Sequence, residues 1–347
     1  MVLNQTKREI IKNRFRFLLF EVFVCFFLIF CASILEWLIL PISLNPEIFG
    51  MLFYTIRLIL VFLAIPTTIY LMDKYISPYK GKLRKTSKIS VFKGHIMLYK
   101  IAKSNYKYQF LYGLILLFLV FIPLNFLLYL LVPEILPYHL NSMKLNVLNS
   151  YLFINDFALF FILLIVIQTS IVFAEESIYR GFINKRGSEN FNKISAVFIS
   201  SYSYGFLSLN FYRFNPWFPV IWFFTMFFIG LILSLLILRR KWLFPSIFSH
   251  SISNIIMVSI IWCFSKGWGY YEILLLIYAP LISISILVFI LQYKRIKESI
   301  SIGLNMLKKY AKNDDKEDEI NSDKYFRIFI DFIIGFILFL ISLLILV

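Results

Sequence analysis

Long apolar stretches recur along almost the whole of this chain. Each has about the 20 residues that a helix needs to cross the hydrocarbon core of a bilayer. The stretches are continuously apolar instead of alternating, which favours helices over the strands of a barrel. Nine candidate spans follow from the pattern, at residues 17–40, 48–72, 109–132, 156–178, 194–211, 217–238, 242–263, 271–292 and 328–347. Since 60% of the 347 residues are hydrophobic, a soluble domain could not bury them. We predict an all-α, polytopic transmembrane bundle of about eight or nine spans.

The distribution of positive charge predicts how these spans are oriented. In a soluble protein the net charge of +16 would suggest a nucleic-acid partner, but 31 of the 35 Lys and Arg residues lie in the N-terminal segment and in alternate connections between spans. Basic residues collect in the cytoplasmic loops of membrane proteins. We therefore expect a multi-pass protein of the cell membrane, embedded in lipid, with a cytoplasmic N-terminus, an external C-terminus and no nucleic-acid partner.

The pattern of spans and charges divides the chain into four regions. Residues 1–108 hold two spans and a basic cytoplasmic segment, which we expect to contact anionic lipid; a binding site for a cytosolic partner is the alternative. Residues 109–292 are predicted to form the membrane core. Residues 293–327 are predicted to be a charged cytoplasmic linker, and the last helix, 328–347, is expected to be peripheral. The three cysteines have no spacing typical of a disulfide framework or a zinc site, and no cofactor is predicted.

Ionisable residues inside apolar spans are rare and mark candidate functional sites. The densest group lies in "FAEESIYRGF", residues 173–182, at the end of the fourth span. On a helix Glu176 and Arg180 are i,i+4 and face the same side, so we expect them to pair. Glu175 is turned about 100° away and has no local partner, which makes it a candidate general base. The alternative is a helix that has already ended, with all three residues in water among the headgroups.

A second polar group lies in the seventh span, in "FPSIFSHSISNII". His250 and Asn254 are i,i+4 and share one helix face. Imidazole and carboxamide groups can both donate hydrogen bonds to a developing oxyanion. Four other ionisable residues lie near predicted span ends, where snorkelling or pairing between helices explains them: Glu21, Glu36, Arg57 and Asp331.

These two groups resemble motifs of a known family. "EESIYR", residues 175–180, resembles the E-E-x-x-x-R motif of the CPBP family, also called Abi or CAAX-protease-like. "HSISN", residues 250–254, resembles its H-x-x-x-N motif. The matching region runs from about residue 150 to 265. The resemblance implies a helical intramembrane endopeptidase, a hydrolase whose site opens towards the cytosol and which acts on membrane-associated peptides or proteins.

The resemblance also implies a role for each motif residue. Glu175 would activate water, and Glu176 with Arg180 would form a structural pair. His250 and Asn254 would stabilise the oxyanion. These residues would make a poor zinc site, because zinc favours three or four His, Cys or carboxylate ligands, so no metal is predicted.

The chain departs from the family in the second motif, F-x-x-x-H. The stretch "FLSLN", residues 206–210, places Asn210 where that His stands. Asn210 could orient a water molecule or donate to an oxyanion, but it cannot exchange a proton near pH 7. If the His assists the base, its loss costs about 10²–10⁴ in rate. Two functions stay open: an active endopeptidase, or an impaired family member that acts as a bacteriocin-immunity or regulatory membrane-binding protein. A transporter is less well supported, because no pair of broken spans is evident.

The motifs can form one site only under a geometric condition. The predicted boundaries put Glu175 at the inner end of the fourth span and Asn210 near the outer end of the fifth, and a straight helix of about 16 residues is about 24 Å long. The helix that carries Glu175 must therefore continue past Tyr179 towards Asn184. The fifth span must start deeper in the membrane or tilt.

Overall fold

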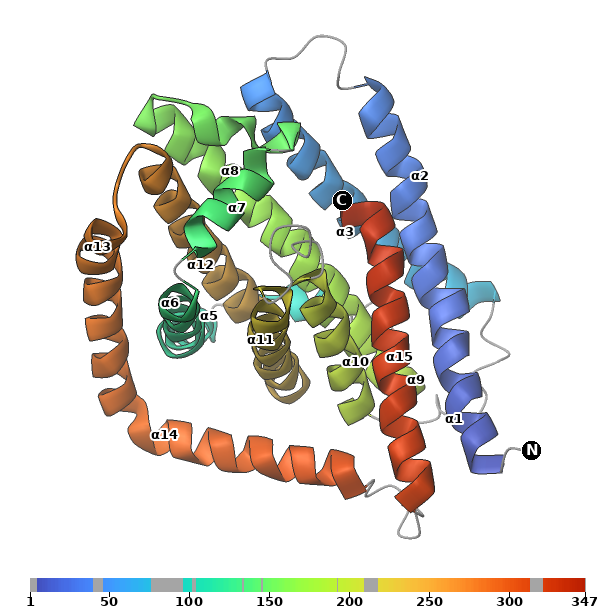
Figure 1. Cartoon of the computed structure of the whole chain (residues 1–347). Coiled ribbons are helices and arrows are strands. Elements are labelled where there is room, and N and C mark those ends of the chain that lie inside the picture. The colour runs from blue at the N-terminus through green and yellow to red at the C-terminus, as the bar shows by residue number, and fades with distance from the viewer. Residues whose placement is uncertain are drawn as a thin grey trace.

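The computed structural model describes residues 5–39, 46–75, 96–101, 104–132, 134–144, 146–191, 193–208, 218–312 and 321–346, and the regular structure of these parts is entirely helical (Figure 1). This confirms the predicted all-α class. Several long helices change from α to π hydrogen bonding along their length and back again. One continuous helix is therefore named in consecutive segments, such as α8, η7 and α9.

The first part of the chain forms α1 (Gln5–Arg16), η1 (Phe17–Val22), α2 (Phe23–Ile39), α3 (Pro46–Tyr75), η4 (Met97–Tyr99), α5 (Tyr106–Leu116), η5 (Leu117–Phe121), α6 (Ile122–Leu131), α7 (Ile135–Lys144) and η6 (Val147–Phe153). The second part forms α8 (Phe157–Glu176), η7 (Ser177–Asn184), α9 (Lys185–Asn190), α10 (Lys193–Phe206), α11 (Phe218–Arg240), α12 (Phe244–Ser265), α13 (Tyr270–Ile273), η9 (Leu274–Tyr278), α14 (Ala279–Lys312) and α15 (Asn321–Leu346).

Seven stretches of the described chain are long and apolar enough to cross a membrane. They are Ile48–Met72, Tyr106–Leu131, Phe157–Asn190, Val220–Arg240, Phe244–Ser265, Tyr270–Lys308 and Ser322–Ser342. The chain is therefore a multi-pass membrane protein, as predicted.

The predicted fifth span, residues 194–211, is described only as far as residue 208. Its helical part, α10, has 14 residues, Lys193–Phe206. It packs against η7, α11 and α15 in the middle of the bundle, and most of its side chains are buried. Its apolar composition reflects burial in protein, which hydropathy alone cannot separate from contact with lipid. Because α10 lies in the core, the hydroxyl of Tyr204 near its C-terminal end lies 3.2 Å from Nε2 of His250.

The last helix is not peripheral, contrary to the prediction from its position after a linker. α15 packs along α10 and also contacts α1 and α2 (Figure 1). Gly335 allows this close approach, because a Cβ atom there would lie 2.6 Å from Cβ of Tyr202. The hydroxyl of Tyr179 donates a hydrogen bond of 3.3 Å to Ser342. The C-terminal helix is therefore part of the wall behind the candidate site.

Buried ion pairs join helices that are far apart in the sequence. Arg186 of α9 donates to Glu21 of η1 through contacts of 2.5 and 3.2 Å. Arg14 of α1 pairs with Asp331 of α15. Of the two alternatives for Glu21 and Asp331, snorkelling or pairing between helices, pairing is therefore the one present, with partners that the sequence did not suggest.

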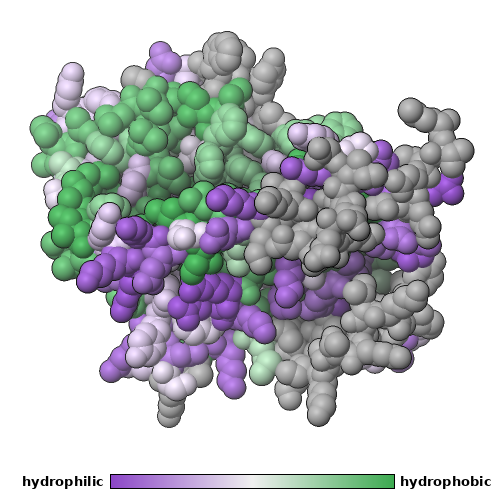
Figure 2. Space-filling model, turned by 90° about the horizontal axis from the view of Figure 1, so that it is seen from below, coloured by the Kyte–Doolittle hydropathy of each residue, from purple (hydrophilic) through white to green (hydrophobic). Residues whose placement is uncertain are grey.

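α14 continues well beyond the apolar stretch that begins it. Its second half, which includes residues 293–312, turns away from the first half and runs along the lower edge of the bundle in Figure 1. Seen from that side, hydrophilic side chains gather beside a hydrophobic area (Figure 2). This is the arrangement expected where helix ends and their charged residues leave the hydrocarbon region.

Candidate active site

One continuous helix carries both adjacent carboxylates into the bundle. α8, η7 and α9 together run from Phe157 to Asn190, so the helix passes Tyr179 and Asn184 as the geometric condition requires. The backbone changes to π hydrogen bonding at Ser177, directly after the carboxylates, and such turns are frequent at functional sites. Glu176 and Arg180 are 0% exposed. The alternative that these side chains lie in water among headgroups is therefore wrong.

Glu176 is held by three groups from two helices. Nε of Arg180 lies 3.5 Å from Oε2, so the predicted i,i+4 pair is present. From α12, Ser246 donates a hydrogen bond of 2.5 Å to the same oxygen. Nδ1 of His250 lies 3.0 Å from Oε1. Both oxygens are engaged, so this carboxylate has a fixed position and a compensated charge.

Arg180 is enclosed by aromatic rings as well as by its carboxylate partner. Its guanidinium carbon lies 4.0 Å from the ring centroid of Tyr204 and 5.8 Å from that of Tyr179. Among the described residues its three side-chain nitrogens have no hydrogen-bond partner. Gly230 provides room beside it, because a Cβ atom there would lie 3.5 Å from Nη2. The cation is therefore stabilised by the Glu176 charge and by ring faces.

His250 connects the two carboxylates. An ionised Glu176 can only accept, so Nδ1 carries the proton that points to it, and Nε2 of a neutral ring is then an acceptor. The hydroxyl of Tyr204 lies 3.2 Å from Nε2. Oε2 of Glu175 lies 4.0 Å from the same nitrogen. The imidazole also stacks on the ring of Phe121, with centroids 5.3 Å apart. Its ring plane and both nitrogens are therefore fixed by neighbours.

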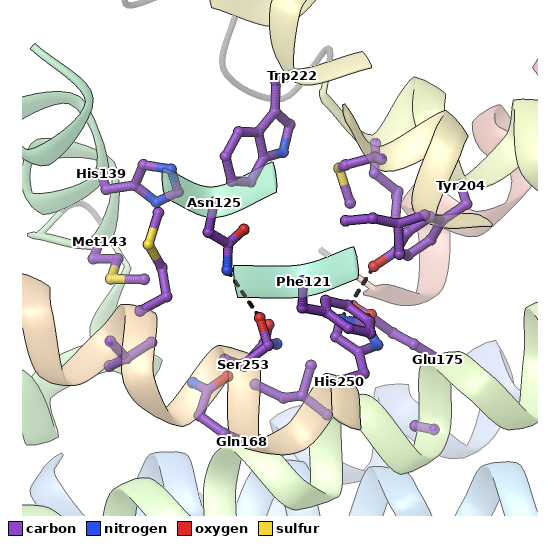
Figure 3. A pocket seen from close by; sticks show the side chains of 18 of the residues that line it. Phe121, Asn125, His139, Met143, Gln168, Glu175, Tyr204, Trp222, His250 and Ser253 are labelled. Carbon is purple, nitrogen blue, oxygen red and sulfur yellow. Dashed lines mark hydrogen bonds and ion pairs between the residues drawn. The ribbon is translucent and has the colours of Figure 1, made fainter. Parts of the chain in front are cut away.

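Glu175 differs from Glu176 in its access to open space. Its side chain is 18% exposed, and it lines a cavity of about 370 Å³. Asn254 and Ser253 line the same cavity one turn beyond His250. Figure 3 shows Glu175, His250 and Tyr204 together at one end of it. A carboxylate, an imidazole and a carboxamide therefore border one space large enough for part of a peptide.

The structure brings together most of the residues that the sequence singled out. Glu176 contacts both Arg180 and His250, His250 also lies 4.0 Å from Glu175, and Asn254 lies on the wall of the same cavity. Asn210 lies outside the described residues.

Sequence reasoning missed several parts of the site. Ser246 lies four residues before His250 on the same helix face, so its contact with Glu176 could have been inferred from spacing. Tyr204 and Phe121 lie on other helices, and no local pattern marks them. In the described part of the chain, no group of three or more His, Cys, Asp or Glu side chains is placed to hold a metal ion.

The comparisons with known proteins bear on this part of the chain. Residues 155–256 match the family model described as "Type II CAAX prenyl endopeptidase Rce1-like". The matched stretch contains both carboxylates, Arg180, His250 and Asn254. No curated protein and no solved structure matched the chain.

Proposed function

Because residues 155–256 of this chain belong to the CPBP family, we propose that the protein is an intramembrane endopeptidase that cuts membrane-associated peptides or proteins. The observation that supports this most directly is the position of Glu175. Its carboxylate borders the cavity and lies 4.0 Å from Nε2 of His250. An acid held against an imidazole beside an open space is an arrangement suited to activating water for hydrolysis.

In the proposed reaction Glu175 takes a proton from a water molecule as that water attacks the scissile carbonyl. The carbonyl oxygen becomes an oxyanion, which the carboxamide N–H of Asn254 stabilises by hydrogen bonding, as Nε2–H of His250 does when both ring nitrogens are protonated. The protonated Glu175 then gives its proton to the leaving amine, and the carbon–nitrogen bond breaks. The products are a new carboxylate and a new amine. Because Glu175 has passed on the proton that it took from water, it is again a carboxylate and can act as base in the next cycle.

The second carboxylate has a positioning role in this proposal. Glu176 holds Nδ1 of His250 and is itself fixed by Ser246 and Arg180. The ring is therefore aligned with the cavity before substrate arrives. Groups that are aligned in advance need no reorganisation at the moment of reaction, which is how enzymes make such contacts effective.

The test is to compare peptide products in membranes that contain the wild-type chain or Glu175→Gln. Cells that lack the protein would be complemented with each version, and the peptides released from their membranes would be identified by mass spectrometry. We expect a set of cleavage products with the wild type that falls at least about 10²-fold in the variant, because the base is lost. Equal thermal stability of the two purified proteins would show that folding is unaffected.

The matched control is Glu298→Gln, an exposed carboxylate of α14. It should give the wild-type products. If Glu175→Gln also gave those products, catalysis by this base would be refuted. Function as an immunity or regulatory binding protein would then be the better description.

A further inference from the structure

The cavity lies on one side of the bundle, and this side is the one that lacks the basic connections. Along α3 it is lined by Tyr54 and Arg57, near the start of the helix, and along α11 by residues from Trp222 to Ile229, again in the first half. Along α5, η5 and α6 it is lined by Phe121 and Asn125, in the second half. Because successive spans run in opposite directions, these halves all belong to the same end of the bundle.

The two helices of the candidate active site show the same asymmetry. On α8 the lining residues run from Gln168 to Glu175, and none lies beyond Glu175. On α12 they run from His250 to Val258, and none lies before His250. Glu175 and His250 are therefore the inner floor of the cavity.

The other end of the cavity is bordered by the connection between α6 and α8. His139, Ser142 and Met143 of α7 and Asn149 of η6 all line it. In Figure 3 His139 and Met143 lie at the end opposite Glu175 and His250. The cavity thus extends from the catalytic residues to a connection that is short of basic residues.

A closed layer lies beneath the floor. Glu176, Arg180 and Ser246 are 0% exposed, as are Phe182 and Leu233 around them. The basic segments lie beyond this layer, at Lys185 and Arg186 on α9 and at Arg239 and Arg240 at the end of α11. Among the described residues, the side chains of this buried layer therefore separate the cavity from the end of the bundle that carries the positive charge.

We propose that the active site is entered from the external face of the membrane and that its substrate is a peptide chain presented there. This inference rests on the proposed function and on the orientation that the basic residues predict. It differs from the cytosolic opening that the family resemblance implied. Exported peptides and the external segments of membrane proteins are then the substrate class, in place of cytosolic C-terminal tails. The amide and hydroxyl groups of Asn125, Gln168 and Ser170 along the wall suit hydrogen bonding to a peptide backbone.

The direction of entry can be tested by cysteine labelling in whole cells. In a chain whose Cys25, Cys31 and Cys263 are replaced by alanine, single cysteines would be placed at the outer rim as Ser142→Cys and Asn149→Cys. The control at the basic end is Arg239→Cys, an exposed position. The probe is a membrane-impermeant maleimide, added to intact cells, to permeabilised cells and to denatured protein.

We expect both rim cysteines to react in intact cells and Arg239→Cys to react only after permeabilisation. Modification of Ser142→Cys from outside should also reduce cleavage at least about tenfold, because the bulky adduct blocks the entrance. External entry is overturned if the rim cysteines react only after permeabilisation or only after denaturation, or if Arg239→Cys reacts in intact cells. None of these results would alter the effect of Glu175→Gln, so failure of this inference can be told apart from failure of the proposed function.

Discussion

Glu176 of α8 and His250 of α12 face each other with Oε1 of the carboxylate 3.0 Å from Nδ1 of the imidazole. This contact fixes which nitrogen of the ring faces the cavity. Nε2 is left to interact with Tyr204 and Glu175. The two carboxylates are adjacent in the sequence but have different surroundings.

The first prediction concerns stability and separates the two carboxylates. Replacing Glu176 with Gln should lower the free energy of unfolding by about 3–5 kcal/mol, because it leaves the buried Arg180 cation without its counter-charge. Glu175→Gln should change the free energy by less than about 1 kcal/mol, since Glu175 borders open space. Thermal unfolding of the detergent-solubilised proteins measures both.

A double variant provides the control for this prediction. Glu176→Gln combined with Arg180→Met removes both charges, and it should recover part of the stability that the single variant loses. Equal losses in Glu175→Gln and Glu176→Gln would contradict the division of roles.

The second prediction concerns Tyr204. Tyr204→Phe keeps the ring face beside Arg180 but removes the hydroxyl that contacts Nε2 of His250. A hydrogen bond contributes about 0.5–1.5 kcal/mol, so kcat should fall about 3–10-fold with KM nearly unchanged. A change in KM alone, with kcat preserved, would show that Tyr204 does not position the imidazole. Tyr204→Leu also removes the ring and should lower the melting temperature in addition.

The third prediction concerns the seam between α15 and α10. Gly335→Ala should lower the free energy of unfolding by about 1–3 kcal/mol, as overpacking does, because the new Cβ would lie 2.6 Å from Cβ of Tyr202. Gly303→Ala on α14 is the matched control, since nothing lies within 4 Å of a Cβ there. It should be neutral or stabilise the helix by up to about 1 kcal/mol. Similar losses in both variants would show that close packing of α15 is not the cause.

The fourth prediction concerns pH and His139 of α7, an element outside the membrane-spanning segments. Burial lowers the pKa of His139 from 6.5 to about 4. Between these two pH values the unfolded chain binds a proton that the folded chain does not, so stability falls as the pH drops from 6.5 towards 4. The loss amounts to about 3 kcal/mol when the pH reaches the folded-state pKa.

His139→Gln should remove this part of the pH dependence. Unfolding followed by intrinsic fluorescence at several pH values between 4 and 7 would measure it. Lys144→Gln, on the same helix, is the matched control and should keep the wild-type slope. A slope that persists in His139→Gln would assign the effect to another group.

Much of the architecture follows from local sequence because each span has its own apolar pattern. The i,i+4 spacing of Glu176 and Arg180 correctly predicted their pairing, and the apolar "GFI" after Arg180 is consistent with the continuation of the helix. α10, in the fifth predicted span, shows what local sequence leaves out. α10 is apolar because protein surrounds it on several sides, and a hydropathy pattern cannot report what covers a helix.

The parts of the site that could not be predicted depend on contacts between helices. Nothing near Tyr204 indicates that its hydroxyl meets His250, 46 residues later in the chain. The pairing of Arg14 with Asp331 joins residues 317 positions apart in the sequence. A single sequence does not indicate which residues so far apart will be in contact. The packing of α15 was misjudged for the same reason.

The π-helical stretch from Ser177 to Asn184 limits how this chain can vary in length. A turn closed by i→i+5 hydrogen bonds contains more residues than an α turn, so a one-residue deletion there could be absorbed as ordinary α-helix. A one-residue deletion in the α-helical part that follows, such as at Lys185 of α9, would instead rotate the rest of the rod by about 100°. Arg186 would leave Glu21, and the anchor between α9 and η1 would be lost while every motif residue stayed in place. A deletion in α9 should therefore be more damaging than a deletion within the π-helical stretch.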